Sequence, residues 1–316
     1  MTKHTPSDYQ YIFGPVVSRR LGISLGVDLV PHKTCTLDCI YCESGQTTCK
    51  TLQKDEYVSV ESVTDELNEV LTGNPRLDFV TLSGSGEPTL HSGIGEIIRF
   101  LKLDYPQYKV ALLTNGTLFN DPHVRKAILG VDVVKASMDA GSEKHFFHIN
   151  RPHHGLNFTA IIDGLVAFRK QYHKKYVIEV FFIPDINDSP DSLKQIKRML
   201  GMIHPDSVQL NTLDRPGAVI DLKPVGPSFL QKASLYLEHA QIINYCDRET
   251  MAQSMDKGCS QHILSALRRR PMTAQDVSKM SGITLVDACS QLEELVKKGK
   301  IEKTCLNRGT FYVFKP

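Results

Sequence analysis

Three cysteines lie close together near the start of the chain. Cys35, Cys39 and Cys42 form a C-x3-C-x2-C cluster in the segment TCTLDCIYCESG. Three thiolates this close can converge on one metal centre, and soft sulfur ligands suit zinc or an iron-sulfur cluster. A 4Fe-4S cluster held by three cysteines leaves one iron open to an external ligand. The alternative is a zinc ion with His32 or Cys49 as fourth ligand, although the second C-x2-C pair of many zinc sites does not occur.

A glycine-rich segment follows the next apolar run of the sequence. Residues 83 to 88 read SGSGEP. Glycines let the backbone approach a ligand closely, and the carbonyl groups together with Glu87 can bind an ammonium group. A plain turn is the alternative interpretation. Both the cysteine cluster and this segment need a framework that brings them together.

Short apolar runs alternate with helix-length segments, which predicts repeated βα units and hence a parallel sheet. A full or partial βα barrel is favoured, and a doubly wound open sheet is the alternative that periodicity does not exclude. In both, polar groups at the carboxyl ends of the strands form the active site. The predicted strands are 21–30, 78–83, 109–113, 132–137, 177–183 and 207–210; the predicted helices are 61–71, 94–101, 124–129, 158–172 and 192–202.

Composition places the chain among packed globular proteins. It has 316 residues, 41% hydrophobic and 23% charged, which excludes fibrous and wholly disordered classes and predicts two domains or one large barrel with an appendage. Eight cysteines are too few for a small disulfide scaffold. No run approaches the length of a membrane-spanning helix, and the segment MTKHTPSDYQ has no signal-like apolar core. We therefore expect a cytoplasmic protein that works without a membrane.

The last part of the chain differs in charge and pattern. Residues 260–316 hold ten Lys and Arg against five acids, so this part carries +5 and the remainder −3 of the net +2. Three helical segments followed by two β-prone runs around Asn307-Arg308-Gly309 predict a winged helix-turn-helix. We expect domains at 1–215 and 260–316, joined by a bridge at 216–259 that contains a helix-like run from 229 to 243.

The basic surplus around the third terminal helix and the wing is typical of nucleic-acid binding. Docking of a peptide along the hairpin edge and a purely structural lid are the alternatives. The residues concerned are Lys297, Lys298, Lys300, Lys303 and Arg308.

With these features in view, the chain resembles the radical SAM superfamily. The C-x3-C-x2-C motif after the first strand, with Tyr41 before the last cysteine, matches that family's motif. The segments GPVVSRRLGISLGVDL and NTLDRPG look like the branch of iron-sulfur oxidoreductases similar to tRNA wyosine-base synthases. The resemblance implies a partial (β/α)6 barrel. Wyosine synthases carry a second cluster on N-terminal cysteines, and no cysteine precedes Cys35 here, which argues against the wyosine reaction itself.

The resemblance also implies the cofactor site. Cys35, Cys39 and Cys42 would bind a 4Fe-4S cluster, whose fourth iron S-adenosylmethionine chelates. The family's Gly-Gly-Glu motif is Gly84-Ser85-Gly86-Glu87 here. Arg151 would pair with the methionine carboxylate and Ile183 would contact adenine, whereas simple strand caps and a solvated arginine are the alternatives. The full set of cofactor-binding residues is Tyr41, Gly84, Gly86, Glu87, Thr114, Asn115, Ser137, Asp139, Arg151 and Ile183.

Other polar residues remain candidates for roles outside the cofactor site. Asn211, Asp214 and Arg215, at the end of the sixth strand, are candidates for substrate binding. His153 and His154 could act as acid-base groups, or simply be exposed. An auxiliary iron-sulfur cluster on Cys49, Cys246 and Cys259 is a further hypothesis, while Cys289 and Cys305 are expected in the core.

The implied reaction is reductive cleavage of S-adenosylmethionine to a 5′-deoxyadenosyl radical, which abstracts hydrogen from a substrate. A donor such as flavodoxin or ferredoxin would supply the electron. We expect a macromolecular substrate, with tRNA ahead of a protein or peptide recognised by the winged helix. The alternative from another class is an iron-sulfur or zinc DNA-binding regulator. Glu87 in its glycine-rich segment and six βα units argue against it, because a sensor needs no cofactor barrel.

Overall fold

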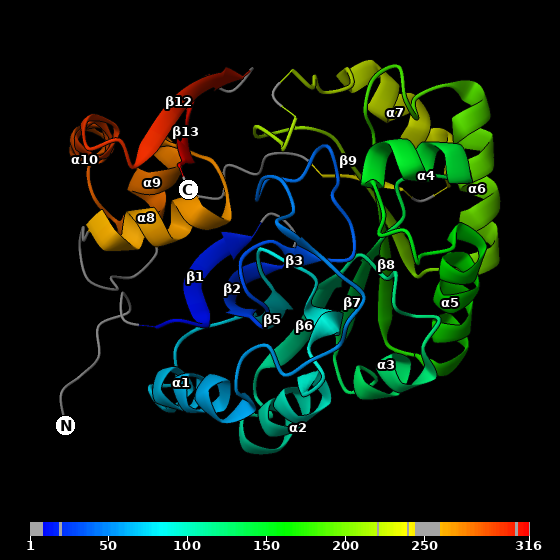
Figure 1. The fold of residues 1–316 in the computed structure, drawn as a ribbon, viewed down its shortest axis with the longest axis horizontal. Coiled ribbons are helices and arrows are strands. Elements are labelled where there is room, and N and C mark those ends of the chain that lie inside the picture. The colour runs from blue at the N-terminus through cyan, green and yellow to red at the C-terminus, as the bar shows by residue number, and fades with distance from the viewer. Residues whose placement is uncertain are drawn as a thin grey trace.

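The computed structural model describes residues 9–18, 21–219, 221–238, 240–243, 260–306 and 309–315. Its main sheet has eight strands in these ranges, in the order β1-β2-β5-β6-β7-β8-β9-β10 (Figure 1). Every pair from β2 to β10 is parallel, and β1 joins the edge antiparallel to β2. The strands are β1 (Ile12–Ser18), β2 (Gly22–Asp28), β5 (Phe79–Ser83), β6 (Lys109–Thr114), β7 (Val133–Ser137), β8 (Lys175–Phe181), β9 (Ser207–Asn211) and β10 (Gln241–Ile242).

Strands follow one another in space in the order in which they occur in the sequence. A doubly wound sheet would reverse its order at a switch point, so the observed order is that of a βα barrel. Over the described residues the sheet begins at β1 and ends at β10 without closing. The prediction of an α/β fold with a parallel sheet is confirmed, and the six predicted strands agree with β2 and β5 to β9 to within two residues.

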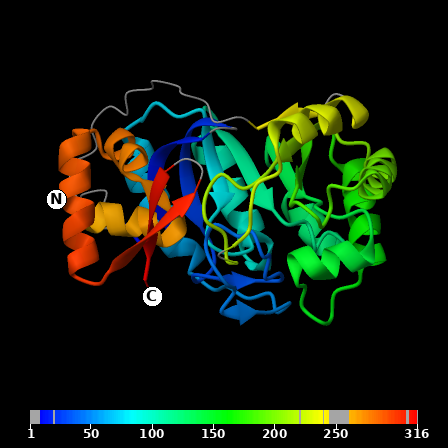
Figure 2. The same ribbon diagram turned by 90° about the horizontal axis from the view of Figure 1, so that it is seen from above.

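Helices cover the outer side of this sheet (Figures 1 and 2). Several begin at a side chain that caps the first turn, such as Ser59, Asp121 and Asn157. Their apolar faces pack with the strands into one large core. The helices are α1 (Val60–Thr72), α2 (Ile94–Asp104), α3 (Pro122–Ala127), α4 (Glu143–Asn150), α5 (Phe158–Gln171), α6 (Pro190–Ile203) and α7 (Pro227–Tyr236).

Three elements differ from the sequence-based expectation. Strand β1 was not expected, because Gly14 and Pro15 interrupt its pattern; the register with β2 shifts between Phe13 and Val16. Helix α4 is an additional short helix before α5. The helix expected over 229–243 ends at Tyr236, and Gln241–Ile242 instead extends the sheet beside β9.

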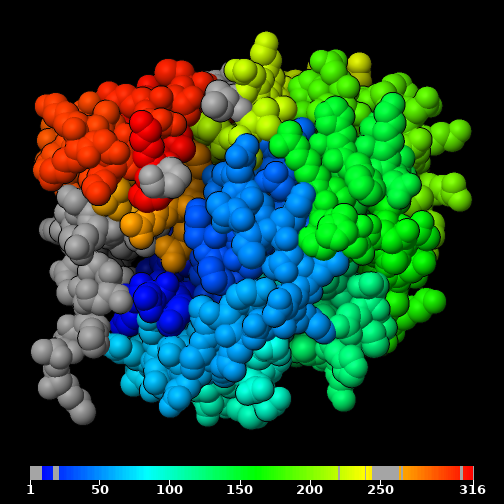
Figure 3. Space-filling view, viewed as in Figure 1, coloured from blue at the N-terminus to red at the C-terminus, as the bar shows by residue number. Residues whose placement is uncertain are grey.

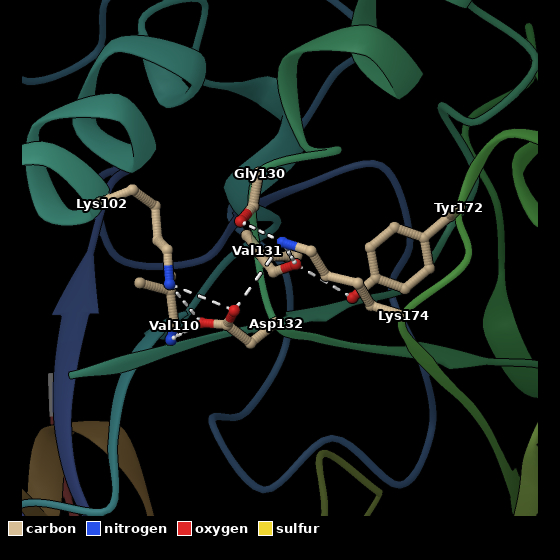
Figure 4. Close-up of polar contacts among 7 residues, drawn as sticks. All are labelled: Lys102, Val110, Gly130, Val131, Asp132, Tyr172 and Lys174. Carbon is tan, nitrogen blue, oxygen red and sulfur yellow. Dashed lines mark hydrogen bonds and ion pairs between the residues drawn. The ribbon is translucent and has the colours of Figure 1, made fainter. Parts of the chain in front are cut away.

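Asp132 secures the start of β7 (Figure 4). Its carboxylate accepts hydrogen bonds from the Val110 amide at 2.8 Å and from Lys102 Nζ at 2.9 Å, while Lys174 Nζ lies 3.7 Å away. The three partners come from β6, α2 and the turn before β8. The Asp132 side chain thereby connects neighbouring βα units at the amino ends of the strands. The loops that follow the carboxyl ends of the strands, called the strand-end loops below, lie at the opposite end of the sheet.

The terminal unit is a separate group of elements with its own core. Its helices are α8 (Ser260–Arg269), α9 (Ala274–Ser281) and α10 (Leu285–Lys297), and its antiparallel sheet has the order β11-β13-β12. The strands are β11 (Met272–Thr273), β12 (Ile301–Leu306) and β13 (Gly309–Phe314). Ile263, Val277 and Leu292 form part of the core between helices and sheet. The expected three helices and hairpin are therefore present.

The terminal unit lies against the edge of the main sheet formed by β1 and β2 (Figures 2 and 3). Arg269 at the end of α8 stacks over the Phe13 ring of β1 at 4.5 Å. No helix among the described residues has both the length and the apolar character needed to cross a membrane.

Candidate functional site

The cysteines lie in a loop that crosses the carboxyl ends of the strands. This cluster loop, residues 35–45, begins at the short strand β3 (Thr34–Cys35), which pairs with β4 (Cys49–Lys50). The Asp38 amide donates to the Asn150 carbonyl at 3.0 Å and the Ile40 amide to the Ile149 carbonyl at 2.9 Å. Backbone hydrogen bonds thus hold the loop to the end of α4.

Each of the three sulfurs is within hydrogen-bonding distance of a side-chain nitrogen donor. Lys33 Nζ lies 3.1 Å from Cys42 Sγ, and Asn150 Nδ2 lies 3.3 Å from Cys39 Sγ. Asn115 Nδ2 lies 3.6 Å from Cys35 Sγ. Donors placed in this way stabilise negative charge on sulfur, as metal-bound thiolates require.

The free thiols of Cys35 and Cys39 are strongly biased toward the neutral form. Burial, reinforced by the Glu87 carboxylate, raises the pKa of Cys35 to about 12. Burial, then Asp139 and Cys42, raises the pKa of Cys39 well above its ordinary value. Buried, mutually repelling thiolates need a cation beside them, because burial alone disfavours their charge. An iron-sulfur cluster supplies that charge, so the donor set fits such a group.

Among the described residues no group of three or more His, Cys, Asp or Glu side chains is arranged around a single ion. Each thiolate of a 4Fe-4S cluster binds a different iron, so such a cluster does not need that arrangement. Cys49, one of the suggested fourth zinc ligands, is exposed on β4.

A cavity of about 200 Å³ opens beside the cluster loop. It lies at the ends of β5, β6, β7 and β8, which is where a parallel sheet gathers its functional groups. Of the predicted cofactor residues, five line it together with two of the cysteines. The lining comprises Cys35, Leu37, Cys39, Gly86, Glu87, Leu113, Thr114, Asn115, Lys135, Ser137 and Glu179.

Glu87 joins two of the strand-end loops. The Thr114 hydroxyl donates to its Oε1 at 2.6 Å, and the Asn115 amide donates to its Oε2 at 2.8 Å. Its side chain also caps the turn that begins at Pro88. Burial raises the pKa of Glu87 despite these hydrogen bonds. The carboxyl group is therefore fixed in direction at the cavity wall.

The two glycines of the loop have different roles. A Cβ on Gly86 would lie 2.1 Å from the Thr34 carbonyl oxygen, so this glycine allows the loop to touch the start of the cluster loop. Gly84 has a φ of +136° and packs against Asp28. Gly84 does not line the cavity, whereas Gly86 does.

Tyr41 and Asp139 lie behind the cluster loop. Asp139 accepts hydrogen bonds from the Tyr41 hydroxyl at 2.5 Å, from Asn150 Nδ2 at 2.7 Å and from the Phe181 amide at 3.0 Å. The Tyr41 ring stacks on Phe181 at 3.9 Å. Burial raises the pKa of Asp139 to about 6. These residues hold the loop from behind and do not line the cavity.

Two other predicted cofactor residues also lie away from the cavity lining. Arg151 ends α4 in a left-handed conformation with φ of 42° and lies 3.9 Å from Asp38 with its side chain largely exposed. Ile183 is buried in a small apolar cluster with Ile40 and Leu213. The structure thus places these two residues beside the cluster loop, outside the cavity wall.

The candidate substrate and accessory residues are placed as follows. Arg215 is buried and bonded to the terminal unit, with Nη1 2.7 Å from Asp276 Oδ2. The His153 and His154 rings contact one another at 4.1 Å. Cys246, Cys259 and Arg308 lie outside the described residues. Cys289 is half-buried, and Cys305 is exposed on β12, so the core position expected for Cys305 is wrong.

Lys135 and Glu179 are site residues that sequence reasoning missed. They come from the neighbouring strands β7 and β8, form an ion pair, and both line the cavity. Their side chains are only 7% and 13% exposed. The available signal was a charged residue inside each of two apolar runs, VVKAS and YVIEVF, where a core strand would hold an apolar side chain.

The chain is similar in sequence to known proteins. The family model of the radical SAM superfamily matches residues 29–196. The protein named GTPase Obg of Brachyspira hyodysenteriae is 35% identical over 310 residues, which are 94% of this chain and 44% of that protein. The chain therefore spans less than half of that relative's length.

A UPF0026 protein of Helicobacter pylori strain 26695 is 34% identical over 279 residues, which are 87% of this chain and 88% of that protein. A solved structure of TYW1 with a lysine-pyruvate adduct bound is similar with a TM-score of 0.49 and 17% identity, over 74% of this chain and 76% of that chain. The chain belongs to the radical SAM superfamily, a family of S-adenosylmethionine-dependent enzymes, and within it resembles the UPF0026 proteins over most of their length.

Proposed function

We propose that Cys35, Cys39 and Cys42 hold a 4Fe-4S cluster and that the cavity beside them binds S-adenosylmethionine. The observation that carries this proposal is the meeting of three donor-supported sulfurs with a cavity walled by Glu87 and Asn115. When bound beside Cys35, Cys39 and Cys42, the reduced cluster and S-adenosylmethionine would supply the reductive carbon-sulfur cleavage that precedes hydrogen abstraction. Flavodoxin or ferredoxin is the class of electron donor that we propose.

The protein's own side chains would position the reactants. Glu87, fixed by Thr114 and Asn115, would receive an ammonium group, and Ser137 offers a hydroxyl to a ribose. Lys135 and Glu179 line the same cavity and would contact the substrate. A buried ion pair is often no more stable than a well-packed apolar pair, so this pair is better explained by binding or catalysis than by stability.

Anaerobic reconstitution with iron and sulfide, followed by dithionite and S-adenosylmethionine, tests the reaction. We expect 5′-deoxyadenosine and methionine from the wild-type chain and none from Cys39→Ala. A preparation with a fully loaded cluster that releases no 5′-deoxyadenosine would refute the proposal. That outcome would favour the alternative, a DNA-binding regulator in which the cluster acts as the sensor.

We propose that the terminal unit is a winged helix-turn-helix and that the substrate is a macromolecule, with tRNA ahead of a protein or peptide. Its net positive charge supports this proposal. Part of the charge is locally balanced, since Lys298 pairs with Glu294 at 2.5 Å and Lys303 with Glu293 at 2.6 Å. Exposed Lys297 and Lys300, at the end of α10 and before β12, are the better candidates for phosphate contacts.

Retention of tRNA at increasing salt tests this substrate class. We expect the double variant K297E/K300E to lose affinity and to show a weaker salt dependence. K170E/K175E, the same charge change on exposed lysines of the main unit, is the control. Equal tRNA binding by both variants and the wild-type chain would overturn the tRNA proposal and favour a peptide substrate.

A further inference from the structure

The terminal unit touches the cluster loop and the end of β2, two segments that lie beside the proposed cofactor cavity. On one side, Ser44 lies two residues after Cys42, the last cysteine of the cluster loop. Its hydroxyl donates a hydrogen bond to the Arg269 carbonyl at 3.0 Å. On the other side, the Arg269 side chain reaches Asp28 at the end of β2, with Nε 3.8 Å from Oδ2. One residue of the terminal unit therefore contacts the cluster loop and the mouth of the barrel.

Asp28 carries this contact to the glycine-rich loop. Its Oδ2 accepts hydrogen bonds from the Ser85 hydroxyl at 3.2 Å and from the Ser85 amide at 3.4 Å. Gly84 packs directly on the same carboxylate, because a Cβ there would lie 2.1 Å from Asp28 Oδ1. The next two residues, Gly86 and Glu87, line the cavity. The chain of contacts from the terminal unit to the cavity wall is thus short and continuous.

The Arg269 side chain is held in place by several groups. It is 18% exposed and stacks over the ring of Phe13. Burial raises the pKa of Asp28, and Arg269 is the strongest influence in the opposite direction, so the arginine favours the charged form of this carboxyl group. Without this cation, Asp28 would face the loop as a buried and poorly compensated charge.

We propose that Arg269 is a positioning residue, which acts through Asp28 to hold the loop of Gly84, Ser85, Gly86 and Glu87 in the form that binds S-adenosylmethionine. The terminal unit is then part of the cofactor site as well as a recognition module. This inference rests on the proposed function, because it requires the cofactor to bind in the cavity beside Gly86 and Glu87. It also couples whatever the terminal unit binds to cofactor affinity.

The test is a titration of the reduced holoenzyme with S-adenosylmethionine, followed by the change in the electron paramagnetic resonance spectrum of the cluster. We expect R269A to bind S-adenosylmethionine about tenfold more weakly, as loss of one partly buried charged contact predicts. The rate of 5′-deoxyadenosine release at saturating cofactor should stay close to that of the wild type. R269K should recover part of the affinity, and D28N should weaken binding in the same direction.

Arg268 provides the matched control. It is the adjacent arginine of α8, and its guanidinium lies over Phe314 within the terminal unit, 5.0 Å from the ring. R268A should therefore bind the cofactor like the wild type. Equal affinities for the wild type, R269A and D28N would overturn the inference, as would equal losses in R268A and R269A. Failure of the wild-type holoenzyme to bind S-adenosylmethionine would instead overturn the proposed function.

Discussion

At the scale of single residues, the cavity combines two kinds of side chain. Glu87, Thr114 and Asn115 form a hydrogen-bonded set that neighbouring loops hold rigidly. Lys135 and Glu179 form a buried pair of opposite charges on adjacent strands. The first set suits a cofactor that must be held in one orientation. The second places two opposite charges in the wall of the same cavity.

Replacement of the Lys135–Glu179 pair separates a chemical role from a structural one. We expect K135M and E179Q each to lower substrate-dependent turnover by more than tenfold and also to lower the unfolding midpoint, because each leaves a buried group without its partner. The double variant K135M/E179M should be about as stable as the wild type, because apolar pairs often replace buried ion pairs without loss. Thermal unfolding and product assays check this. A double variant that keeps full turnover would contradict the assignment.

The role of Gly86 can be tested by adding a single carbon atom, the Cβ of alanine. G86A should disrupt cluster assembly, because its Cβ would overlap the Thr34 carbonyl oxygen. Iron content and absorbance of the reconstituted protein measure the effect. G201A in α6 is the control, since a Cβ there meets no atom within 4 Å. It should leave assembly intact and raise stability by up to about 1 kcal/mol.

At the scale of elements, the parallel strands bring together residues that lie far apart in the sequence. The cluster loop follows β2, while the groups facing it follow β5, β6 and β7. Asp132 helps to fix this arrangement from the opposite end of the sheet (Figure 4). Burial tends to raise the pKa of Asp132, but the hydrogen bond from Val110 and the ion pairs with Lys102 and Lys174 outweigh it, so the pKa is lowered.

This shift predicts a pH-dependent contribution to stability. Since the folded pKa lies below the ordinary value of 3.8, the carboxylate stabilises the fold above that pH. The stabilisation is lost as the pH falls through the lowered pKa. We expect D132N to be less stable by about 1–2 kcal/mol at pH 7, with the difference shrinking below pH 3.8. Denaturant unfolding across pH measures it, and D163N on the exposed face of α5 should show no such trend.

The local sequence pattern was sufficient to predict some elements of the fold and insufficient to predict others. The cysteine spacing, the glycine-rich segment and the alternating runs are local signals, and they predicted the cluster loop and six strands well. Strand β1 escaped prediction because glycine and proline mask its apolar pattern. The partners of Arg215 were also invisible, because Asp276 lies 61 residues away and nothing local indicates that the two meet. Arg215, a candidate for substrate binding from the sequence, instead connects the main unit to the terminal unit.

At the scale of the whole molecule, the main and terminal units meet through buried charge. Arg215 donates to the Pro271 carbonyl at 2.6 Å and to Asp276 at 2.7 Å, and it lies 3.8 Å from Glu43 in the cluster loop. Asp276 also accepts a hydrogen bond from the Thr273 amide at the start of α9. The interface thus connects the first turn of a terminal helix to residues next to the cluster.

Loss of this arginine should weaken the interface strongly. R215A leaves buried acidic partners without their cation, and removal of one partner of a buried ion pair costs about 3–5 kcal/mol. We expect hydrogen exchange to accelerate in α9 and β11 before the main sheet is affected. R215K should give an intermediate effect. Unchanged exchange in α9 would show that the contact does not hold the two units together.

We propose above that Cys35, Cys39 and Cys42 hold a 4Fe-4S cluster whose remaining iron receives S-adenosylmethionine. Electron paramagnetic resonance of the reduced, reconstituted chain tests it most directly. The wild type should show a reduced 4Fe-4S signal whose g values change when S-adenosylmethionine is added, and Cys35→Ala should show neither the full signal nor the change. A wild-type cluster signal that S-adenosylmethionine leaves unaltered would contradict the claim.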